Sequence, residues 1–475
     1  MPRLSATHTP SVVNKSSALP NTRSKPNCNH PIMAKEMPTA SCEVMDTTAD
    51  SKGEPTNLCV FSAPMKAHER IKRTAEYAED PAGYLQKALG KETFESRRPV
   101  LSLPGTVDMD AYGTGEHRQH FEQHIASFLG KQHGLFFVTG IQAQLAALKT
   151  HADRAGQTKV AWHLSCHLEW AEARSFETLY GLERLLLGSA PETMPTVDEI
   201  KRILGLPKEE RPAAILLEIP NRVLGCQTYT FEELEEISSA CREAGVVLHM
   251  DGARLWEIEP YYQAMSGKSF ADLTALFDSV YVSFYKGVGG ATGAMLVTDD
   301  ESLIDEARLW QHRAGGRAFT LGYEVIDDER GFNENIGTFA RKRDKMIEVV
   351  DAVKAATAGY KSMGGSKIVN FEPDRPTCCQ ILTGFDGFTE EQLMDARDRV
   401  QAKTNVRIFD LLRPKEAVHV EANEDVQEGD NLNGSVDQKR HFKEWMIMSV
   451  TEKIETRVFV DAYVGLCKEL VGKAS

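Results

Sequence analysis

Short apolar runs alternate with amphipathic segments from about residue 65 to residue 345, and this pattern predicts a folded α/β unit. Two helices are expected: one follows the capping sequence Thr230-Phe-Glu-Glu233 and ends at Gly245, and the other covers residues 301–313. The apolar runs that read as buried strands are Ala213–Ile219, Val246–Met250, Ser279–Tyr285 and Ala294–Thr298. Strands that alternate with helices favour a three-layer α/β/α domain around a mostly parallel sheet.

The pattern changes in residues 346–475, which we expect to form a smaller α+β domain. Two helices are predicted there, one from the capping sequence Thr389-Glu-Glu-Gln392 and one over residues 455–471. The strand-like runs are Lys367–Phe371, Cys378–Thr383, Val406–Leu411 and Glu444–Val450. Acidic residues between 421 and 430, a stretch without Lys or Arg, are interpreted as an exposed insertion loop; the alternative, a cation site, lacks EF-hand spacing.

Residues 1–64 are predicted to be a disordered tail. Prolines recur throughout this segment among many Ser, Thr and Asn residues, so it offers little apolar surface to offset the entropy of ordering. No acidic residue precedes Glu36, as in a transit peptide, but the prolines argue against the amphipathic helix of such a peptide. We therefore expect a cytoplasmic protein and leave organelle targeting open.

Composition excludes several classes of function. With 55 Lys and Arg against 69 Asp and Glu, the net charge of −14 is unsuited to sequence-independent nucleic-acid binding. We expect no membrane span, because the apolar runs are far shorter than the ~20 residues that a helix needs to cross a bilayer. The nine cysteines are scattered without a C-x-x-C pair, so a disulfide framework or a metal site is not expected. A reducing, intracellular compartment fits best.

Two strand ends carry the candidate chemistry. Asp251 directly follows one predicted strand, and Lys286 directly follows another. The carboxyl ends of parallel strands meet at one edge of a sheet, where ligands bind. A lysine that can form a Schiff base, with a carboxylate that keeps a ring nitrogen protonated, is what pyridoxal phosphate requires. Taken alone the pair is weak evidence, since lysines at strand ends are usually solvated.

Several motifs resemble those of the threonine aldolase and aromatic amino acid beta-eliminating lyase family. They are His249-Met-Asp-Gly-Ala-Arg-Leu-Trp256, Ser283-Phe-Tyr-Lys-Gly-Val-Gly-Gly290, the helix Ala307–Gly316, the turn within Phe136–Leu145, and Tyr112-Gly113. The resemblance spans about residues 105–320 in the family's order. It implies a pyridoxal-phosphate-dependent enzyme of fold type I, the aspartate aminotransferase fold.

The resemblance also implies roles for individual residues. Lys286 would hold pyridoxal phosphate as a Schiff base, Asp251 would pair with the pyridine nitrogen, and Arg254 would lie near the ring oxygen or the substrate carboxylate. His167 matches the histidine that stacks on the ring. The phosphate would be held by Thr139, Gly140, Ile141 and Gln142, at a strand-to-helix turn with free backbone N–H groups, and further cofactor contacts would come from Asn221 and Ser283.

Simpler interpretations stand beside these roles. His167 could be an ordinary half-buried histidine, Arg254 a structural ion-pair partner of Asp251, and the turn at Thr139 only a helix start. The glycines of Gly287–Gly293 do not form a dinucleotide loop, because a strand rather than a helix follows them.

The sequence departs from the family around the substrate. The family's carboxylate-binding arginine has no counterpart in Glu444–Val450, nor does its N-terminal carboxylate segment in Arg97–Pro104. Pro220-Asn221 stands where the family has a histidine. The candidates to replace the missing arginine are Arg254, Arg313, Arg317 and Arg375.

The expected reaction is retro-aldol cleavage of a β-hydroxy-α-amino acid to glycine and an aldehyde. His167 is the candidate base, because its unperturbed pKa lies near neutrality. Racemisation or β-elimination with the same cofactor is the alternative, and a non-catalytic protein of the same fold is the third hypothesis. The resemblance implies a small-molecule amino acid substrate and a homodimer or homotetramer.

Overall fold

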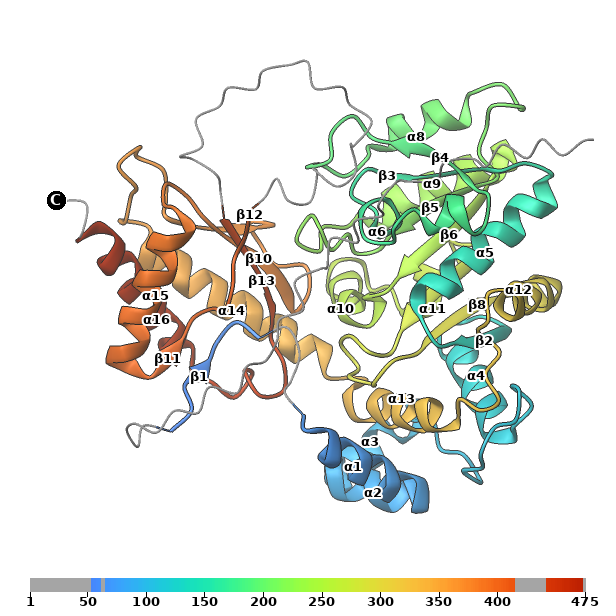
Figure 1. The fold of residues 1–475 in the computed structure, drawn as a ribbon, viewed down its shortest axis with the longest axis horizontal. Helices are drawn as coiled ribbons and strands as arrows, with labels where there is room; N and C mark the ends of the chain where they lie inside the picture. The colour runs from blue at the N-terminus through green and yellow to red at the C-terminus, as the bar shows by residue number, and fades with distance from the viewer. Residues whose placement is uncertain (1–52, 61–64, 415–440, 473–475) are drawn as a thin grey trace, which may run out of the picture. The chain divides into compact units, whose positions relative to one another are not determined.

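A seven-stranded sheet forms the centre of the larger part of the chain (Figure 1). The computed structural model describes residues 53–60, 65–414 and 441–472. The strands are β2 (His133–Phe137), β3 (Lys159–His163), β4 (Glu183–Leu187), β5 (Ala214–Glu218), β6 (Val247–Gly252), β7 (Ser279–Ser283) and β8 (Ala294–Thr298). Their order is β2-β8-β7-β6-β5-β3-β4, and β8 runs antiparallel to both neighbours while the other pairs are parallel. The mostly parallel sheet predicted from the sequence is therefore present.

Helices cover both faces of this sheet. Successive strand residues point to opposite faces, so the neighbours of β2 identify the two layers. Leu135 and Phe137 share a core with residues of α5 (Gly140–Ala155) and α12 (Glu301–Arg313). Phe136, between them, belongs to the core that contains residues of α4 (Glu116–Phe128) and α9 (Phe231–Ala244). The architecture is thus the three-layer α/β/α arrangement expected.

Sequence-encoded caps bound some of the helices of this part. At α9, the Thr230 side chain accepts a hydrogen bond from the Glu233 N–H, and Gly245 ends the helix with a φ of 67°. The other helices are α1 (Ala67–Glu79), α2 (Pro81–Leu89), α3 (Lys91–Arg97), the 3-10 turn η1 (Arg98–Val100), α6 (His167–Trp170), α7 (Ser175–Thr178), α8 (Val197–Leu204), α10 (Leu255–Ser266), α11 (Phe270–Thr274), α13 (Gly322–Asn335) and α14 (Phe339–Thr357).

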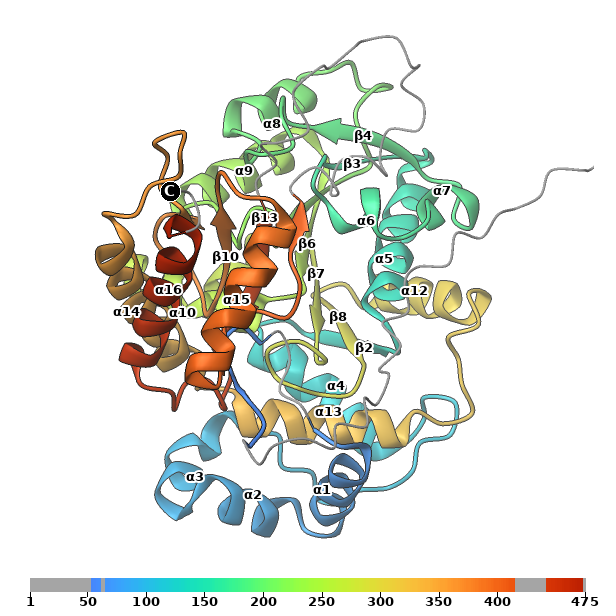
Figure 2. The ribbon, with the colours of Figure 1, turned by 60° about the vertical axis from the view of Figure 1, so that its left-hand side comes forward.

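The C-terminal part contains an antiparallel sheet of order β12-β13-β10-β9, covered by α15 (Glu390–Thr404) and α16 (Thr456–Val471), which lie side by side (Figures 1 and 2). Its strands are β9 (Val369–Glu372), β10 (Gln380–Phe385), β12 (Arg413–Pro414) and β13 (His441–Met446). Aromatic pairs such as Trp445 with Phe459 join the sheet to α16. The prediction of a strand through Leu411 is wrong, since β11 covers Val406–Arg407 and the chain then buries Ile408 and Phe409 outside any strand. The acidic stretch at 421–430 lies outside the described residues.

The N-terminal segment departs from its prediction as a disordered tail. In β1 (Thr56–Asn57) the chain pairs in parallel with β11, and Leu58 is fully buried. Burial of Leu58 and Cys59, together with the backbone pairing, offsets the cost of ordering residues 53–60. The tail prediction is therefore wrong for residues 53–60, and the other residues of the predicted tail, 1–52 and 61–64, lie outside the described part. The boundary predicted after residue 345 falls within α14, so the division into two domains stays a prediction.

Candidate active site

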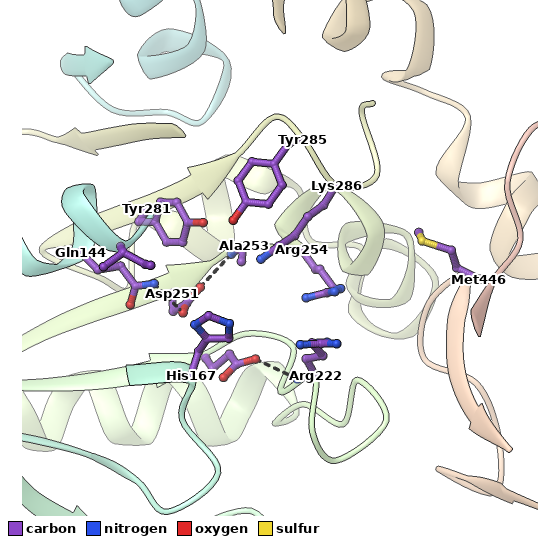
Figure 3. A pocket seen from close by; sticks show the side chains of 12 residues that line it. Gln144, His167, Arg222, Asp251, Ala253, Arg254, Tyr281, Tyr285, Lys286 and Met446 are labelled. Carbon is purple, nitrogen blue, oxygen red and sulfur yellow. Dashed lines mark hydrogen bonds between the residues drawn. The ribbon is translucent and has the colours of Figure 1, made fainter. Parts of the chain in front are cut away.

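A cavity of about 250 Å³ opens where β5, β6 and β7 end (Figure 3). Its position is the one expected for a ligand site in an open α/β sheet. It is lined by Ile141, Gln144, His167, Glu218, Arg222, Asp251, Ala253, Arg254, Tyr281, Tyr285, Lys286 and Met446. The structure therefore brings together five of the residues predicted from the sequence: Ile141, His167, Asp251, Arg254 and Lys286.

Asp251 forms the floor of the cavity. Its carboxylate accepts hydrogen bonds from Gln144 Nε2 at 2.9 Å and from the Ala253 N–H at 3.0 Å. Because the side chain is buried and held at both oxygens, its carboxyl group has a fixed orientation toward whatever occupies the cavity. Gln144, which fixes one oxygen from α5, was not predicted from the sequence.

Lys286 stands three residues beyond the end of β7. Burial, and then the positive charge of Arg254, lower the pKa of its amine to about 8, while Asp251 and Glu218 oppose this shift. The segment after the lysine is held by Glu257, whose Oε1 accepts a hydrogen bond from the Gly287 N–H at 2.9 Å. The result is a positioned amine that is partly neutral near physiological pH.

His167 is the first residue of α6, and its ring lies near Asp251 and Arg222 (Figure 3). Its Nδ1 is 2.5 Å from Glu172 Oε1, and 36% of the His167 side chain is exposed while Glu172 is almost covered. The carboxylate fixes the orientation of the imidazole, which leaves the other nitrogen for chemistry in the cavity.

The turn from β2 into α5 lies beside the cavity. Thr139 caps the helix, because its Oγ1 accepts a hydrogen bond from the Gln142 N–H at 3.3 Å. Gly140 packs so closely on the Tyr281 hydroxyl group that a Cβ would overlap it. Among the described residues, Oε1 of Gln142 is buried without a hydrogen-bond partner. Since the first N–H groups of a helix also lack intrahelical partners, the turn offers several unused polar groups.

Ser283 and Asn221, both predicted as cofactor contacts, do not line this cavity in the described structure. Ser283 Oγ donates a hydrogen bond to the Ala253 carbonyl oxygen at 2.7 Å, and so fixes the turn after Asp251. Asn221 Nδ2 donates to Ser165 Oγ at 2.8 Å and lies at a small neighbouring cavity. Their geometry favours positioning roles over direct contacts.

Two arginines meet one glutamate at the side of the cavity. Arg222 follows β5, and its Nε and Nη2 donate hydrogen bonds to Glu444 at 2.7 and 2.6 Å. Arg254 Nη2 is 3.8 Å from the same carboxylate. Burial opposes ionisation of Glu444, but the hydrogen bond and the charge of Arg222 keep its pKa below the usual value.

Sequence reasoning missed Arg222. Of the arginines considered as replacements for the family's missing one, Arg254 lines the cavity, whereas Arg313, Arg317 and Arg375 are not among the described lining residues. Arg313 stacks instead on the Trp310 ring at 4.6 Å. The signal that could have identified Arg222 is its place four residues after Glu218, at the same sheet edge as Asp251.

Comparisons with known proteins identify relatives that match about half of the chain. Low-specificity L-threonine aldolase 1 of Arabidopsis thaliana is 26% identical over 220 residues, which are 46% of this chain and 60% of that protein. An alanine racemase of Cochliobolus carbonum is 23% identical over 274 residues, 56% of this chain and 69% of that protein. The chain spans about three fifths of the length of the first curated relatives that it matches.

A solved structure from Listeria monocytogenes, provisionally named as an L-allo-threonine aldolase, is 30% identical with a TM-score of 0.68, and the match covers 88% of this chain and 97% of that one. The fold is that of the fold type I pyridoxal phosphate enzymes. The family model described as beta-eliminating lyase matches residues 105–424. Because this match takes in most of the chain, including every residue that lines the cavity except Met446, the chain belongs to the beta-eliminating lyase family, whose cofactor is pyridoxal phosphate.

Proposed function

We propose that the protein is a pyridoxal-phosphate-dependent lyase that cleaves the Cα–Cβ bond of a β-hydroxy-α-amino acid, giving glycine and an aldehyde. The observation that carries the proposal is the shared cavity of Lys286, Asp251 and His167. It supplies an amine of lowered pKa for cofactor attachment and a fixed carboxylate for the ring nitrogen of the cofactor. It also supplies an oriented imidazole for the proton of the β-hydroxyl group.

The residues present fit the cofactor. Lys286 is the amine for covalent attachment, and Asp251 is the buried carboxylate that a protonated ring nitrogen needs. The N-terminus of α5, with the amide groups of Gly140 and Ile141, suits a phosphate group because the helix dipole and free N–H groups favour an anion. We assign Thr139 and Gln142 to the same phosphate site.

Pyridoxal phosphate supplies a protonated ring that takes up the electron pair left at Cα when the bond to Cβ breaks. Asp251 holds the proton on the ring nitrogen, and its bonds to Gln144 and Ala253 prevent it from turning away. Arg254 lines the same cavity and would orient the substrate through its own positive charge.

His167 accepts the proton of the β-hydroxyl group as the aldehyde forms. Glu172 holds Nδ1 of the ring, so the proton is taken at Nε2 and the resulting positive charge is stabilised by the neighbouring carboxylate. The partial exposure of His167 gives the aldehyde a route to solvent.

A proton NMR time course in D₂O tests the proposal. Enzyme and pyridoxal phosphate are mixed with the isomers of threonine, with phenylserine, and with serine and alanine. We expect glycine and the matching aldehyde from a β-hydroxy substrate, and no product from the Lys286→Ala variant. Lack of glycine from every β-hydroxy substrate would overturn the proposed reaction.

A racemase is the second candidate. Lys286 is an amine in the cavity whose pKa is lowered to about 8, and it would move a proton at Cα. The similarity to an alanine racemase favours the same alternative. Loss of the α-proton signal of alanine without formation of glycine would identify it.

The proposal includes an amino acid as the small-molecule substrate and a homodimer or homotetramer as the assembly. Among the described helices, none is both long and apolar enough to cross a membrane.

A further inference from the structure

The Glu444 carboxylate sits in a set of donors suited to a bound ligand. The Arg222 guanidinium group holds both of its oxygens, and Gln380 Nε2 donates to one of them. Gln380 is in turn held by Arg254, whose Nε donates to Gln380 Oε1 at 2.7 Å. A two-pronged arginine contact with an added amide donor is the arrangement by which proteins recognise a carboxylate.

Two of these donors, the arginines, are exposed to the cavity. Arg222 and Arg254 line it, and their guanidinium groups are directed toward the same part of it (Figure 3). The carboxylate reaches them from β13, whose Met446 lines the cavity as well. Glu444 thus reaches, from the C-terminal sheet, the two arginines at the side of the cavity.

We propose that Arg222 and Arg254 form the site for the substrate's α-carboxylate, and that Glu444 occupies this site as an internal carboxylate which the substrate displaces. This inference rests on the proposed function, and it adds the internal group that the substrate's carboxylate would displace. It also provides a replacement for the carboxylate-binding arginine that β13 lacks, because Arg222 comes from the loop after β5.

The exchange keeps the charges of the site balanced. A buried arginine that loses its carboxylate is strongly destabilised, whereas the replacement of one carboxylate by another leaves each guanidinium group paired throughout. The displaced Glu444 still has a cationic neighbour, because Arg413 on β12 is close enough to help lower its pKa. An amine without a carboxylate has nothing with which to replace Glu444, so the internal carboxylate acts as a specificity device.

Glycine and ethanolamine are the probes for the test, since both carry a primary amine and glycine alone carries a carboxylate. Each is titrated into the cofactor-loaded full chain, and its dissociation constant is read from the visible absorbance of the cofactor. We expect Arg222→Gln to weaken glycine binding tenfold or more and Arg222→Lys to weaken it less, while ethanolamine binding stays within twofold. We expect Glu444→Gln to tighten glycine binding threefold or more.

The control is Arg399→Gln, which removes an arginine that pairs with Glu469 on the helices of the C-terminal part. It should change neither titration. Equal weakening of both probes by Arg222→Gln would make Arg222 structural, and weaker glycine binding in Glu444→Gln would make Glu444 part of the binding site rather than its competitor. Either result overturns the inference.

A measurement without the cofactor separates this inference from the proposed function. Acetate should raise the unfolding midpoint of cofactor-free Glu444→Gln more than that of the cofactor-free parent protein, because the carboxylate site is then vacated. The double variant Arg222→Gln/Glu444→Gln should lose the response. No acetate response in Glu444→Gln overturns the inference, whereas failure of Lys286 to bind the cofactor would count against the proposed function instead.

Discussion

Glu218 and Asp251 are register partners on the adjacent strands β5 and β6, so two carboxyl groups meet at one end of the sheet. Burial, and then the charge of Asp251, raise the pKa of Glu218. Among the described residues, Oε2 of Glu218 is buried without a hydrogen-bond partner, so no donor stabilises a charge on this oxygen. Glu218 is therefore more readily protonated than an exposed glutamate.

This raised pKa predicts how stability depends on pH. The pKa of Glu218 is raised above its ordinary 4.5, so its contribution is full below pH 4.5 and is lost as the pH rises through the folded-state pKa. In cofactor-free protein, the free energy of unfolding of the parent relative to Glu218→Gln should therefore fall as the pH rises above 4.5. Urea denaturation at several pH values measures this difference, and a constant difference would contradict it.

The lowered pKa of Lys286 predicts the pH dependence of cofactor capture. A neutral amine is the attacking form, so the rate should rise with pH and level off above about pH 8 instead of near the usual 10.5. Stopped-flow absorbance with cofactor-free enzyme measures the rate. A simple lysine derivative under the same conditions corrects for titration of pyridoxal phosphate itself.

Two variants should move this midpoint in opposite directions. Arg254→Gln removes a positive charge that lowers the pKa of Lys286, so the midpoint should rise. Asp251→Asn removes a negative charge that raises the same pKa, so the midpoint should fall. A shift in the same direction for both would exclude the electrostatic explanation.

His167→Asn should lower kcat by about 10²- to 10⁴-fold, the usual contribution of a general base, without loss of the bound cofactor's absorbance. Glu172→Gln should lower kcat less, because it leaves the imidazole in place and removes the charge that stabilises its protonated form. Steady-state kinetics with a β-hydroxy substrate measure both. His312→Asn, an exposed histidine on α12, is the control, and an effect of His167→Asn on KM alone would contradict a base.

Gly287→Ala should destabilise the protein and weaken cofactor binding. A Cβ at this position would lie 2.5 Å from the carboxyl carbon of the buried Glu257, and such overpacking costs about 1–3 kcal/mol. Gly359→Ala is the matched control, because nothing lies within 4 Å of its Cβ position. Thermal unfolding and cofactor titration measure the effects, and equal results for the two variants would contradict the close packing.

Local patterns accounted for most of the fold. The helix expected at residues 301–313 is α12, and the run Ala213–Ile219 contains β5, because burial and capping depend on residues near in sequence. Motif order also placed Asp251 and Lys286 at one cavity. The ion pair of Arg222 and Glu444 could not be predicted from local patterns, because its partners are 222 positions apart and meet through the packing of separate sheets.

The order found in residues 53–60 bears on how the protein is prepared. The carbonyl oxygen of Val60 accepts a hydrogen bond from the N–H of Met446, a residue of the strand that carries Glu444 and itself a part of the cavity wall. A shortened version that begins at residue 65 would leave that strand without this support and uncover Leu58's place in the core. Trimming or protease treatment upstream of residue 53 spares these contacts. A cut between residues 53 and 60 would instead weaken the support of the strand whose Met446 lines the cavity.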